Sequence, residues 1–458
     1  MLLDTWLEIV ADWKDVFAQA RTTRRAVRQA LGSLVCLGRR TLSRVIWTNG
    51  GEQRSWSSEY FLHSRAEWDP QQLFAPLLKR ALTWCPGRLV GVAVDDTRLR
   101  KTGLCIPQAF YQRDPLSPPF HWNLIRGLRF LQASLLLPLH RCAPVGSRAL
   151  PIRFQDAPAV KRPRRNAPLE QWRWYRELVK RLNLSRRFTR MMGQLRQMLD
   201  EAGAANQILV LAADGSFCNR TVFSAPRDRT EIIARARKDA VLCFRVPQPS
   251  RRFYALDKFT PEQVRQDEAI PWQTTKLFYG GKRRRIRYKE LPCLYWRTGA
   301  RQQPLRLLVV APTPYRNRQS GRLYYRRPAY LLTTDLGSSA KPLLQIYFDR
   351  WQIEVNHREE KDTLGVGQAQ LWNETAVPKQ PVLVVAAYSA LLLASLITFG
   401  AERNTAYAAL PKWIRHAKRP SCLDLITLLR KEMAEHPAML ASYDVQTSDR
   451  GLVAAAAA

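Results

Sequence analysis

Apolar residues recur at helical spacing over residues 1–85, and this pattern predicts a helical N-terminal region. The stretch "DTWLEIVADWKDVFAQA" places apolar side chains three and four residues apart. The following stretch, "TTRRAVRQALGSLVCLGRRTLSRVIWTNGG", predicts two basic helices with a glycine between them. Short helices with arginines on their faces suit contact with a nucleic acid; a plain helical subdomain with solvated arginines is the alternative.

Three largely apolar runs predict buried strands of one sheet. They cover residues 89–94, 128–140 and 208–212. The first run ends in Asp95, Asp96 and Thr97, and the third is followed by Asp214. Between the second and third runs, residues 167–203 have Leu and Trp at intervals of three and four, which predicts one long basic helix. Strands and helices that alternate in this way indicate an α/β fold.

Residues 222–335 consist of short apolar runs with turn signals between them, a pattern that predicts β-hairpins. Basic and aromatic residues are interleaved here, as in "GGKRRRIRYKE" and "YRNRQSGRLYYRRPAY". On a β platform such residues can neutralise a nucleic-acid backbone and stack on bases. The alternative is that they protect exposed sheet edges, where Lys and Arg are also common.

The stretch "YFDRWQIEVNHREEKDTLG", residues 347–365, predicts a helix that ends at its glycine. At about 100° per residue, one stripe about 60° wide contains Tyr347, Arg350, Glu354 and Lys361. Four polar side chains on one stripe can form a site. The alternative is a solvated face with an Arg350–Glu354 ion pair, which is worth roughly a few tenths of a kcal/mol.

The most apolar segment, residues 381–401, is long enough to span a membrane. It is rich in Ala and Ser, contains Tyr388 and stands alone, so we expect a buried core helix and no membrane partner. Residues 411–458 predict a basic helical tail, and the stretch "GLVAAAAA" at residues 451–458 has the composition of an unstructured end.

The charge balance points to a class of partner. Lys and Arg total 73 against 38 Asp and Glu, which gives a formal net charge of +35 over 458 residues. This excess favours a polyanionic partner, with nucleic acid ahead of an anionic membrane surface. Eight cysteines are scattered without CxxC spacing, which argues against a clustered zinc site and favours reduced thiols in a cytoplasmic protein.

The carboxylates Asp96, Asp214 and Glu354 form a candidate metal site. The ends of parallel strands tend to meet at one edge of an α/β sheet, where a carboxylate from a packed helix can join them. Oxygen ligands suit Mg²⁺ or Mn²⁺, and two such ions can clamp the oxygens of a phosphoryl displacement. Asp95 is the alternative first carboxylate, because adjacent side chains of a strand point to opposite faces. His357, beside the stripe, is a less favoured ligand because three carboxylates suffice.

These motifs resemble the DDE transposases of bacterial insertion sequences, more narrowly the group with a Tyr-Arg-Glu-Lys pattern. The resemblance rests on Asp96–Thr97, on Asp214–Gly215–Ser216–Phe217 and on the spaced set Tyr347, Arg350, Glu354 and Lys361. It implies an RNase H-like catalytic core in which Asp96, Asp214 and Glu354 are catalytic and bind two Mg²⁺ (or Mn²⁺) ions. It also implies that Tyr347, Arg350 and Lys361 hold DNA phosphates beside the cleaved end.

The resemblance further implies a domain order. A helical end-binding region would occupy residues 1–85, the two parts of the catalytic core residues 86–221 and 336–410, and a β-rich insertion residues 222–335. The helical region 411–458 would follow and could take part in dimerisation.

In relatives that form a DNA hairpin, a Trp of the insertion replaces a flipped base. Trp272 and Trp296 are candidates here, and burial in the β-sheet is the alternative for both.

The implied function is that of a cut-and-paste transposase. It would bind inverted-repeat ends, hydrolyse DNA phosphodiesters and join the 3′-hydroxyl ends to target DNA, as a homodimer on DNA in the bacterial cytoplasm, associated with the nucleoid. Two competing functions share many of these features. One is a catalytically silent DNA-binding relative, domesticated or inhibitory, and the other is an RNase H-like nuclease that cuts without joining strands.

Overall fold

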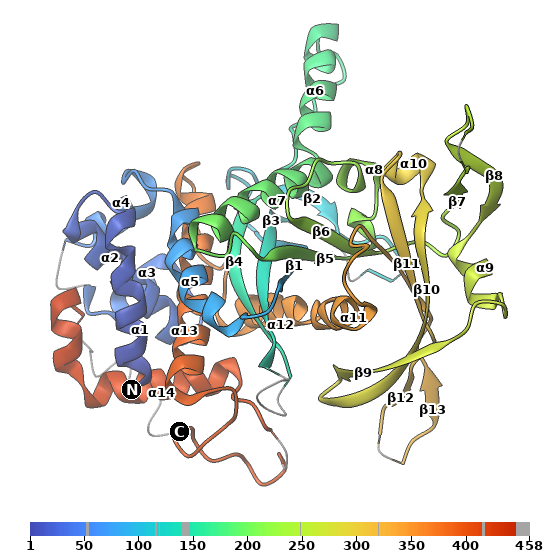
Figure 1. The fold of residues 1–458 in the computed structure, drawn as a ribbon. Helices are drawn as coiled ribbons and strands as arrows, with labels where there is room; N and C mark the ends of the chain where they lie inside the picture. Colours follow the sequence, from blue (N-terminus) through green and yellow to red (C-terminus); the bar gives the residue numbers. More distant parts are fainter. Residues whose placement is uncertain are drawn as a thin grey trace.

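A large mixed sheet forms the centre of the molecule (Figure 1). The computed structural model describes residues 1–51, 55–114, 117–118, 120–139, 146–247, 249–318, 320–414 and 417–445. In this part of the chain the sheet has twelve strands, ten of them in the order β2-β3-β1-β5-β6-β14-β11-β10-β7-β8, while β4 pairs with β3 and β9 with β10. Strands β1, β5 and β6 are mutually parallel and the other pairings are antiparallel. The predicted α/β mixture is therefore confirmed.

The strands and helices have the following bounds. The strands are β1 (Leu89–Arg100), β2 (Phe110–Arg113), β3 (Leu124–Leu137), β4 (Arg148–Asp156), β5 (Ile208–Ala213), β6 (Thr230–Arg235), β7 (Leu242–Arg245), β8 (Tyr254–Phe259), β9 (Gln273–Tyr279), β10 (Lys282–Tyr295), β11 (Pro304–Val310), β12 (Pro314–Arg316), β13 (Leu323–Tyr325) and β14 (Ala329–Thr333). The α-helices are α1 (Leu2–Ala11), α2 (Ala20–Val35), α3 (Leu42–Thr48), α4 (Ser57–Ser64), α5 (Phe74–Ala81), α6 (Leu169–Leu182), α7 (Leu184–Glu201), α8 (Arg220–Phe223), α9 (Pro261–Gln266), α10 (Arg297–Ala300), α11 (Ala340–Asp349), α12 (Gln352–Arg358), α13 (Ala376–Phe399) and α14 (Cys422–Glu435).

Strand β1 is longer than its apolar run predicts. Its register with β5 ends at the pair Val94–Ala213, but its register with β3 continues to Arg100. Asp95 and Asp96 therefore lie inside β1 and not at its end. The strand continues because β3 supplies backbone partners after β5 has ended, and this long-range pairing leaves no mark in the local apolar pattern.

Alternate residues of β1 and β5 face two different cores. Val92 and Leu211 belong to the main core, which also contains the apolar side of α7. Ala93 packs with Ile353 of α12, while Ala212 packs against α11. The sheet thus has α7 on one face and the α11–α12 segment on the other, as Figure 1 shows. Each side chain of β1 belongs to one face according to its position in the alternation.

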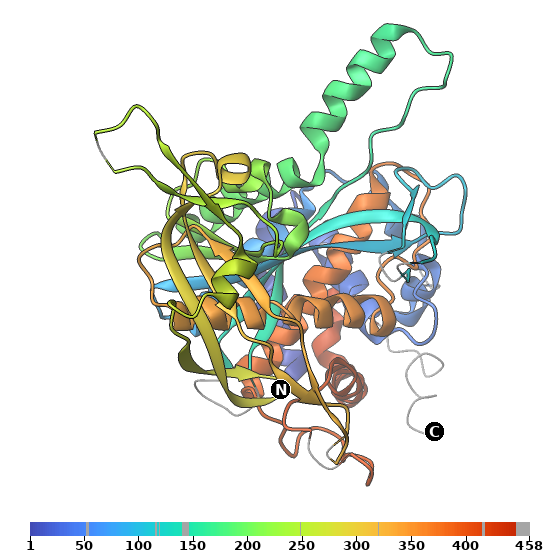
Figure 2. The same cartoon turned by 90° about the vertical axis from the view of Figure 1, so that its right-hand side faces the viewer.

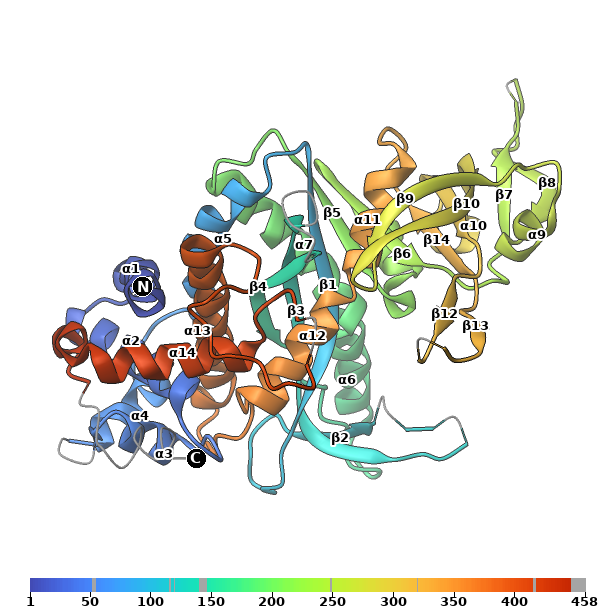
Figure 3. The same cartoon turned by 90° about the horizontal axis from the view of Figure 1, so that it is seen from below.

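The strands of residues 222–335 extend the central sheet. Strand β6 pairs with β5, and β14, β11 and β10 follow outward in the sheet order. One hairpin of this region joins β9 to β10 through Gly280 and Gly281, which both have positive φ, 59° and 78°. Glycine adopts this conformation at little cost, and two such residues make a tight turn between antiparallel strands. Figure 3 shows these strands at the opposite end of the molecule from the N-terminal helices.

The N-terminal helices pack around α13 together with α14 (Figure 3). Helix α13 is long and apolar enough to be a membrane-span candidate, the one such helix found among the described residues, and 83% of its most apolar window is buried inside the protein. Tyr388, at its centre, is fully buried and its hydroxyl bonds to Glu359 and Asn356. These contacts are those of the predicted core helix. Cys36, Cys105, Cys218, Cys243, Cys293 and Cys422 are free thiols; Cys142 and the stretch 451–458 lie outside the described residues.

The first helix is capped by a residue from the last. The buried carboxylate of Glu432, in α14, accepts hydrogen bonds from the backbone N–H groups of Leu2 at 3.1 Å and Leu3 at 2.6 Å. We expect Glu432→Ala to lower the free energy of unfolding by about 2–4 kcal/mol, because it leaves two buried donors without a partner. Urea unfolding would measure the loss. The exposed neighbour Glu435→Ala is the control and should change stability by about 0.5 kcal/mol or less.

The segment predicted as one helix over residues 167–203 is in fact two helices. It breaks at Asn183, whose side chain accepts a hydrogen bond from Arg186 N at 2.9 Å and caps α7. An Asn at this position competes with the helix backbone and favours a new N-terminus. Helix α7 lies on the sheet, whereas α6 projects away from the body of the protein (Figures 1 and 2).

Candidate active site

Asp95 in β1 and Asp214 directly after β5 lie level with each other at the ends of the paired part of two neighbouring parallel strands. The register pairs Gly91 with Val210, Ala93 with Ala212 and Val94 with Ala213, so Asp95 and Asp214 are the next residues along. A β-carbon on Gly91 would meet Ile346 of α11, and Ala93 contacts Ile353 of α12. By alternation, Asp95 belongs to the face that carries the α11–α12 segment.

Asp96 belongs to the opposite face and is surrounded by arginines. Its Oδ2 lies 3.4 Å from Arg98 NH2, and the charge of Arg129 also acts on it. Burial raises the pKa of Asp96, and these two arginines oppose that rise; the charge of Asp214 also raises this pKa, and that of Lys361 lowers it. Among the described residues, its buried Oδ2 has no hydrogen-bond partner. Sequence alone could suggest Arg98, two residues along the same strand, but Arg129 reaches the site only through the pairing of β3 with β1.

The predicted helix over residues 347–365 is interrupted twice. Helix α11 ends at Asp349, α12 starts at Gln352, and Glu359–Thr363 form a π-helical turn. The segment ends at Gly365, which has a φ of 59°. Because a π turn winds more loosely than an α-helix, the position of Lys361 cannot be calculated at 100° per residue. Wide turns of this kind are frequent at functional sites.

Three members of the predicted stripe remain neighbours. Arg350 NH2 lies 3.3 Å from Glu354 Oε1, and the Arg350 guanidinium lies 5.9 Å from the centre of the Tyr347 ring. The Arg350 and Glu354 side chains are 14% and 35% exposed, so the pair is more sheltered than a surface ion pair. Lys361 lies within range of the Asp95 charge and of Arg98, and burial lowers its pKa. The structure therefore brings the stripe to the carboxylates of the sheet.

The carboxylates influence one another's ionisation. Burial, then the charges of Asp214 and Asp96, raise the pKa of Asp95 to about 7. Burial also raises the pKa of Glu354, with a further contribution from Asp214 and opposition from Arg350. Asp214 itself accepts hydrogen bonds from the backbone and hydroxyl of Ser216 at 3.0 and 2.6 Å. Negative charge from three distant parts of the chain is thus concentrated around Asp214.

The carboxylate oxygens of this cluster are suitable ligands for a divalent cation, but the side chains are not close enough together in this structure to hold one ion. Carboxylate oxygens are the ligands that Mg²⁺ and Mn²⁺ prefer, and repelling carboxylates gain from a cation between them. Within the described ranges, no three His, Cys, Asp or Glu side chains are grouped closely enough to hold one ion. The carboxylates would have to draw together around a metal. His357 is buried beside Arg350 and Lys361, and burial lowers its pKa to about 3.

A basic cavity adjoins the site. It has a volume of about 570 Å³ and is lined by four cations, Arg39, Arg98, Arg100 and Lys361, and by two carboxylates, Asp114 and Asp362. Arg100 is paired with Asp114 at 3.0 Å, so the lining keeps a net positive charge. Arg39 comes from the N-terminal helical region, so residues of that region and of the sheet meet here. Sequence reasoning did not single out Arg39 or Arg98, because neither belongs to a motif. A cavity with this lining suits a phosphate backbone.

The two candidate tryptophans of residues 222–335 lie partly buried against the main core. Trp272 has Lys289 4.9 Å and Arg287 5.3 Å from its ring centre. Trp296 packs against Phe223 at 6.3 Å between ring centres. These contacts account for both side chains as packing residues of the sheet, and the hairpin role stays a prediction.

Asp349, at the end of α11, is expected to contribute to a dependence of stability on pH. It is buried, accepts hydrogen bonds from Ser147 Oγ at 2.7 Å and Gln345 Nε2 at 3.0 Å, and burial raises its pKa to about 7. A raised carboxyl pKa means that the folded state holds a proton that the unfolded state releases, so stability falls as pH rises from about 4 to about 7. The slope is at most about 1.4 kcal/mol per pH unit for one group.

We expect Asp349→Asn to reduce this slope. The amide resembles the protonated carboxyl, so the variant should match the wild type below about pH 4 and be the more stable protein at pH 8. Urea unfolding at several pH values measures the slope, with the exposed Asp15→Asn as the control. Equal slopes for Asp349→Asn and the wild type would contradict the prediction.

Comparisons with known proteins bear on this site. No curated protein matches the chain. Among solved structures, the chain is similar to a cryo-EM structure of the piggyBac transposase synaptic complex with hairpin DNA, with 13% identity and a TM-score of 0.34 over 96% of this chain and 80% of that chain. We transfer no residue from that structure, because this score does not establish a common fold.

A family model described as DDE superfamily endonuclease matches residues 15–303, which include Asp95, Asp96 and Asp214 and end before α11. The match covers more than half of the chain, which therefore belongs to the DDE superfamily endonucleases.

Proposed function

We propose that this endonuclease is a cut-and-paste DNA transposase of a bacterial insertion sequence, of the group with the Tyr-Arg-Glu-Lys pattern. One observation carries the proposal. Asp95 and Asp214 lie level on parallel strands, on the sheet face where α12 carries Glu354 beside Arg350. Carboxylates that come from three distant segments and lie next to the guanidinium of Arg350 suit phosphoryl transfer on DNA. The mixed sheet with helices on both faces supports an RNase H-like core.

The chain's own residues would position the DNA backbone. Arg350 can grip a phosphate with two parallel hydrogen bonds, and its contact with Glu354 holds it at the carboxylates. Lys361 supplies a compact charge within range of Asp95. Tyr347 stacks beside Arg350 and limits the directions in which the guanidinium can turn. The basic cavity that includes Lys361 would continue the path of the phosphates toward the N-terminal helices.

The first carboxylate, Asp214 and Glu354 would hold two Mg²⁺ or Mn²⁺ ions. Asp96 is the residue that the family pattern indicates, and the strand register favours Asp95. Bound divalent ions supply activation of a water or a DNA 3′-hydroxyl and neutralise the departing oxygen. Residues 1–85 would bind the transposon ends, and the protein would act in the cytoplasm as a homodimer on DNA.

The test is an incubation of the purified protein with a labelled duplex that carries the terminal repeat of its element, with Mg²⁺, with Mn²⁺ and with EDTA. Metal-dependent cutting at the repeat boundary, together with products joined to a second DNA, is the expected result. Cutting without joined products would identify a nuclease of another kind. Tight binding without cutting under either metal would identify a silent DNA-binding relative.

A further inference from the structure

Residues 158–182, which we call the α6 arm, leave the body of the protein and return to it. The chain rises after β4 and comes back down as α6, which projects from the rest of the fold (Figures 1 and 2). No residue of α6 is buried. A helix of 14 residues is about 21 Å long, so the arm extends well beyond the surface around it.

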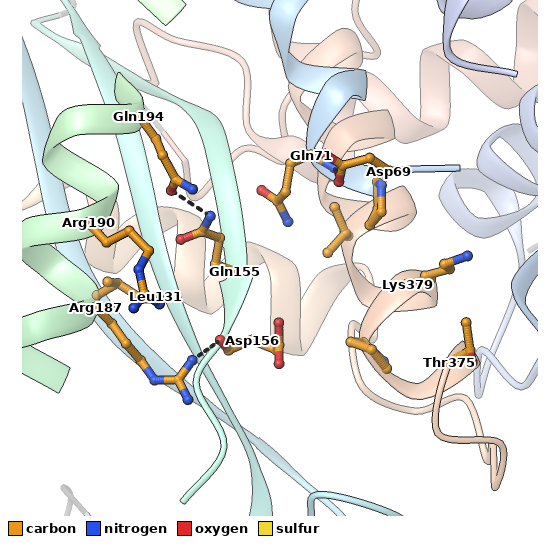
Figure 4. Close-up of a pocket in the computed structure, with 13 residues that line it drawn as sticks. Asp69, Gln71, Leu131, Gln155, Asp156, Arg187, Arg190, Gln194, Thr375 and Lys379 are labelled. Atoms are coloured by element: carbon orange, nitrogen blue, oxygen red, sulfur yellow. Dashed lines mark hydrogen bonds between the residues drawn. The ribbon is translucent and has the colours of Figure 1, made fainter. Parts of the chain in front are cut away.

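The arm is held firmly at its root. Arg187, in the first turn of α7, donates from Nε to Leu182 O at 2.9 Å, from NH1 to Asp156 O at 3.1 Å and from NH2 to Pro158 O at 3.3 Å. One guanidinium therefore ties together the places where the chain leaves and re-enters the body. Figure 4 shows Arg187 and its bond to Asp156 at a cavity of about 430 Å³ between β4, α7 and α13. The arm is positioned by the fold and is not a loose loop.

The root of the arm lies beside the candidate carboxylates on two sides. On one side, Arg129, whose charge acts on Asp96, donates from Nε to Ala157 O at 3.1 Å. On the other side, α7 packs on the turn that follows Asp214: the Phe188 and Phe217 rings are 4.7 Å apart, and Asn219 Nδ2 donates to Ser185 Oγ at 2.9 Å. A DNA segment held at the carboxylates would therefore pass close to the base of the arm.

The arm is strongly basic and its charges are arranged in a stripe. It contains eight Lys or Arg and two Glu. At about 100° per residue, Arg173, Arg176 and Lys180 fall within about 60° of one another. Within the described part of the chain, no carboxylate lies in ion-pairing range of Arg173 or Arg176, and Lys180 pairs only with the exposed Glu177 at 3.1 Å. The stripe is thus available to an external anion.

Aromatic residues occupy the side of the helix next to this stripe. The Trp172 ring lies 5.4 Å from the Arg162 guanidinium and 5.9 Å from the Tyr175 ring, so the rising segment of the arm covers part of the apolar side of α6. Because of this contact, Arg162 lies against α6, and it and the basic residues next to it in the chain add their charge to that of the helix. The whole arm is therefore a positive projection with its apolar side partly satisfied by its own chain.

We propose that the α6 arm is a second DNA-binding element that contacts the phosphates of the duplex held at the carboxylates, outside the site itself. The proposal rests on the proposed function, since it takes DNA as the substrate. Charge complementarity identifies the partner: a rigid, basic projection beside a phosphoryl-transfer site matches a duplex backbone. Contacts of this kind do not read sequence, so the arm would hold the DNA on either side of the cleaved bond whatever its sequence.

The test compares two triple variants in binding to a labelled 40-bp duplex of arbitrary sequence over a range of salt concentrations. The arm variant is Arg173→Gln, Arg176→Gln, Lys180→Gln. The control variant removes three exposed charges elsewhere: Lys79→Gln, Lys412→Gln, Lys431→Gln. Because each lost phosphate contact reduces the slope of log K against log salt by about 0.9, the arm variant should lose about 2 to 3 from this slope. The control should lose less than 1.

Thermal unfolding must show that the arm variant is folded, which we expect because α6 has no buried residue. A slope equal to that of the wild type or of the control would overturn the proposal. An unchanged slope together with a lower oligomeric state of Trp174→Ala in sedimentation would instead identify the arm as a contact between protein copies, and would also overturn it. Metal-dependent cutting by the wild type is measured in parallel. Normal cutting with an unchanged slope refutes the arm alone, whereas a reduced slope without any cutting refutes the proposed function alone.

Discussion

Glu354→Gln is expected to reduce DNA strand cleavage by at least about 10³-fold while DNA binding persists. The carboxylate lies on α12, 3.3 Å from Arg350 and within the field of Asp214, so it would share the charge of a catalytic cation. Loss of a charged group that supplies several kcal/mol to the transition state has this effect, since each 1.4 kcal/mol is a factor of ten. Binding should persist because the basic residues of the cavity and of the N-terminal helices are unchanged.

The measurement is a single-turnover cleavage assay with Mg²⁺, accompanied by a binding assay on the same duplex. Glu374→Gln, an exposed change of the same kind outside the site, is the matched control and should cut at the wild-type rate. Asp214→Asn should lose as much activity as Glu354→Gln, because both carboxylates belong to one cluster. Wild-type cutting by both Glu354→Gln and Asp214→Asn would place the chemistry elsewhere in the molecule.

The second large effect is a difference in the loss of DNA cleavage between variants of Asp95 and Asp96, the two adjacent aspartates of β1. We expect Asp95→Asn to lose at least about 10³-fold in cleavage and Asp96→Asn to lose about tenfold or less. Asp95 is level with Asp214 and on the α12 face, whereas Asp96 is on the other face, where Arg98 and Arg129 act on it more strongly than Asp214 does. A catalytic cation would therefore be near Asp95, and Asp96 would chiefly balance the two arginines.

A second measurement separates metal binding from other causes of lost activity. Mn²⁺ should raise the thermal midpoint of the wild type and of Asp96→Asn, and should have little effect on Asp95→Asn, because a ligand stabilises only the state that binds it. The reverse pattern in both assays would assign the first carboxylate to Asp96, as the family pattern indicates.

The sequence predicted where the strands lie along the chain better than it predicted which strands and helices contact one another. The apolar runs at β1 and β5 marked real strands, because a strand buried on both faces needs continuous apolar residues. What the runs could not indicate is that β3 continues to pair with β1 past Val94, or that Ile353 packs on Ala93. The choice between Asp95 and Asp96 depends on these two long-range contacts.

Helix ends were predicted less well than helix positions. The break at Asn183 follows from a capping side chain, which could have been identified in the sequence. The break after Asp349 and the π turn at Glu359–Thr363 have no such signal in the local pattern. The predicted proximity of Tyr347, Arg350 and Glu354 was nevertheless preserved, because they lie within the first two turns of the segment. Lys361 lies farther along, after the first break and inside the π turn.

The contact between Glu432 and the backbone of Leu2 and Leu3 has a consequence for biosynthesis. Helix α1 cannot complete its capping during synthesis until α14 has been made, some 430 residues later. At typical elongation rates, α1 would wait roughly 20 to 90 s for its partner. Chains arrested before α14 should leave α1 open to proteolysis, and released full-length chains should protect it. Completion of the helical body would then depend on synthesis of α14, which would delay DNA capture until that helix has left the ribosome.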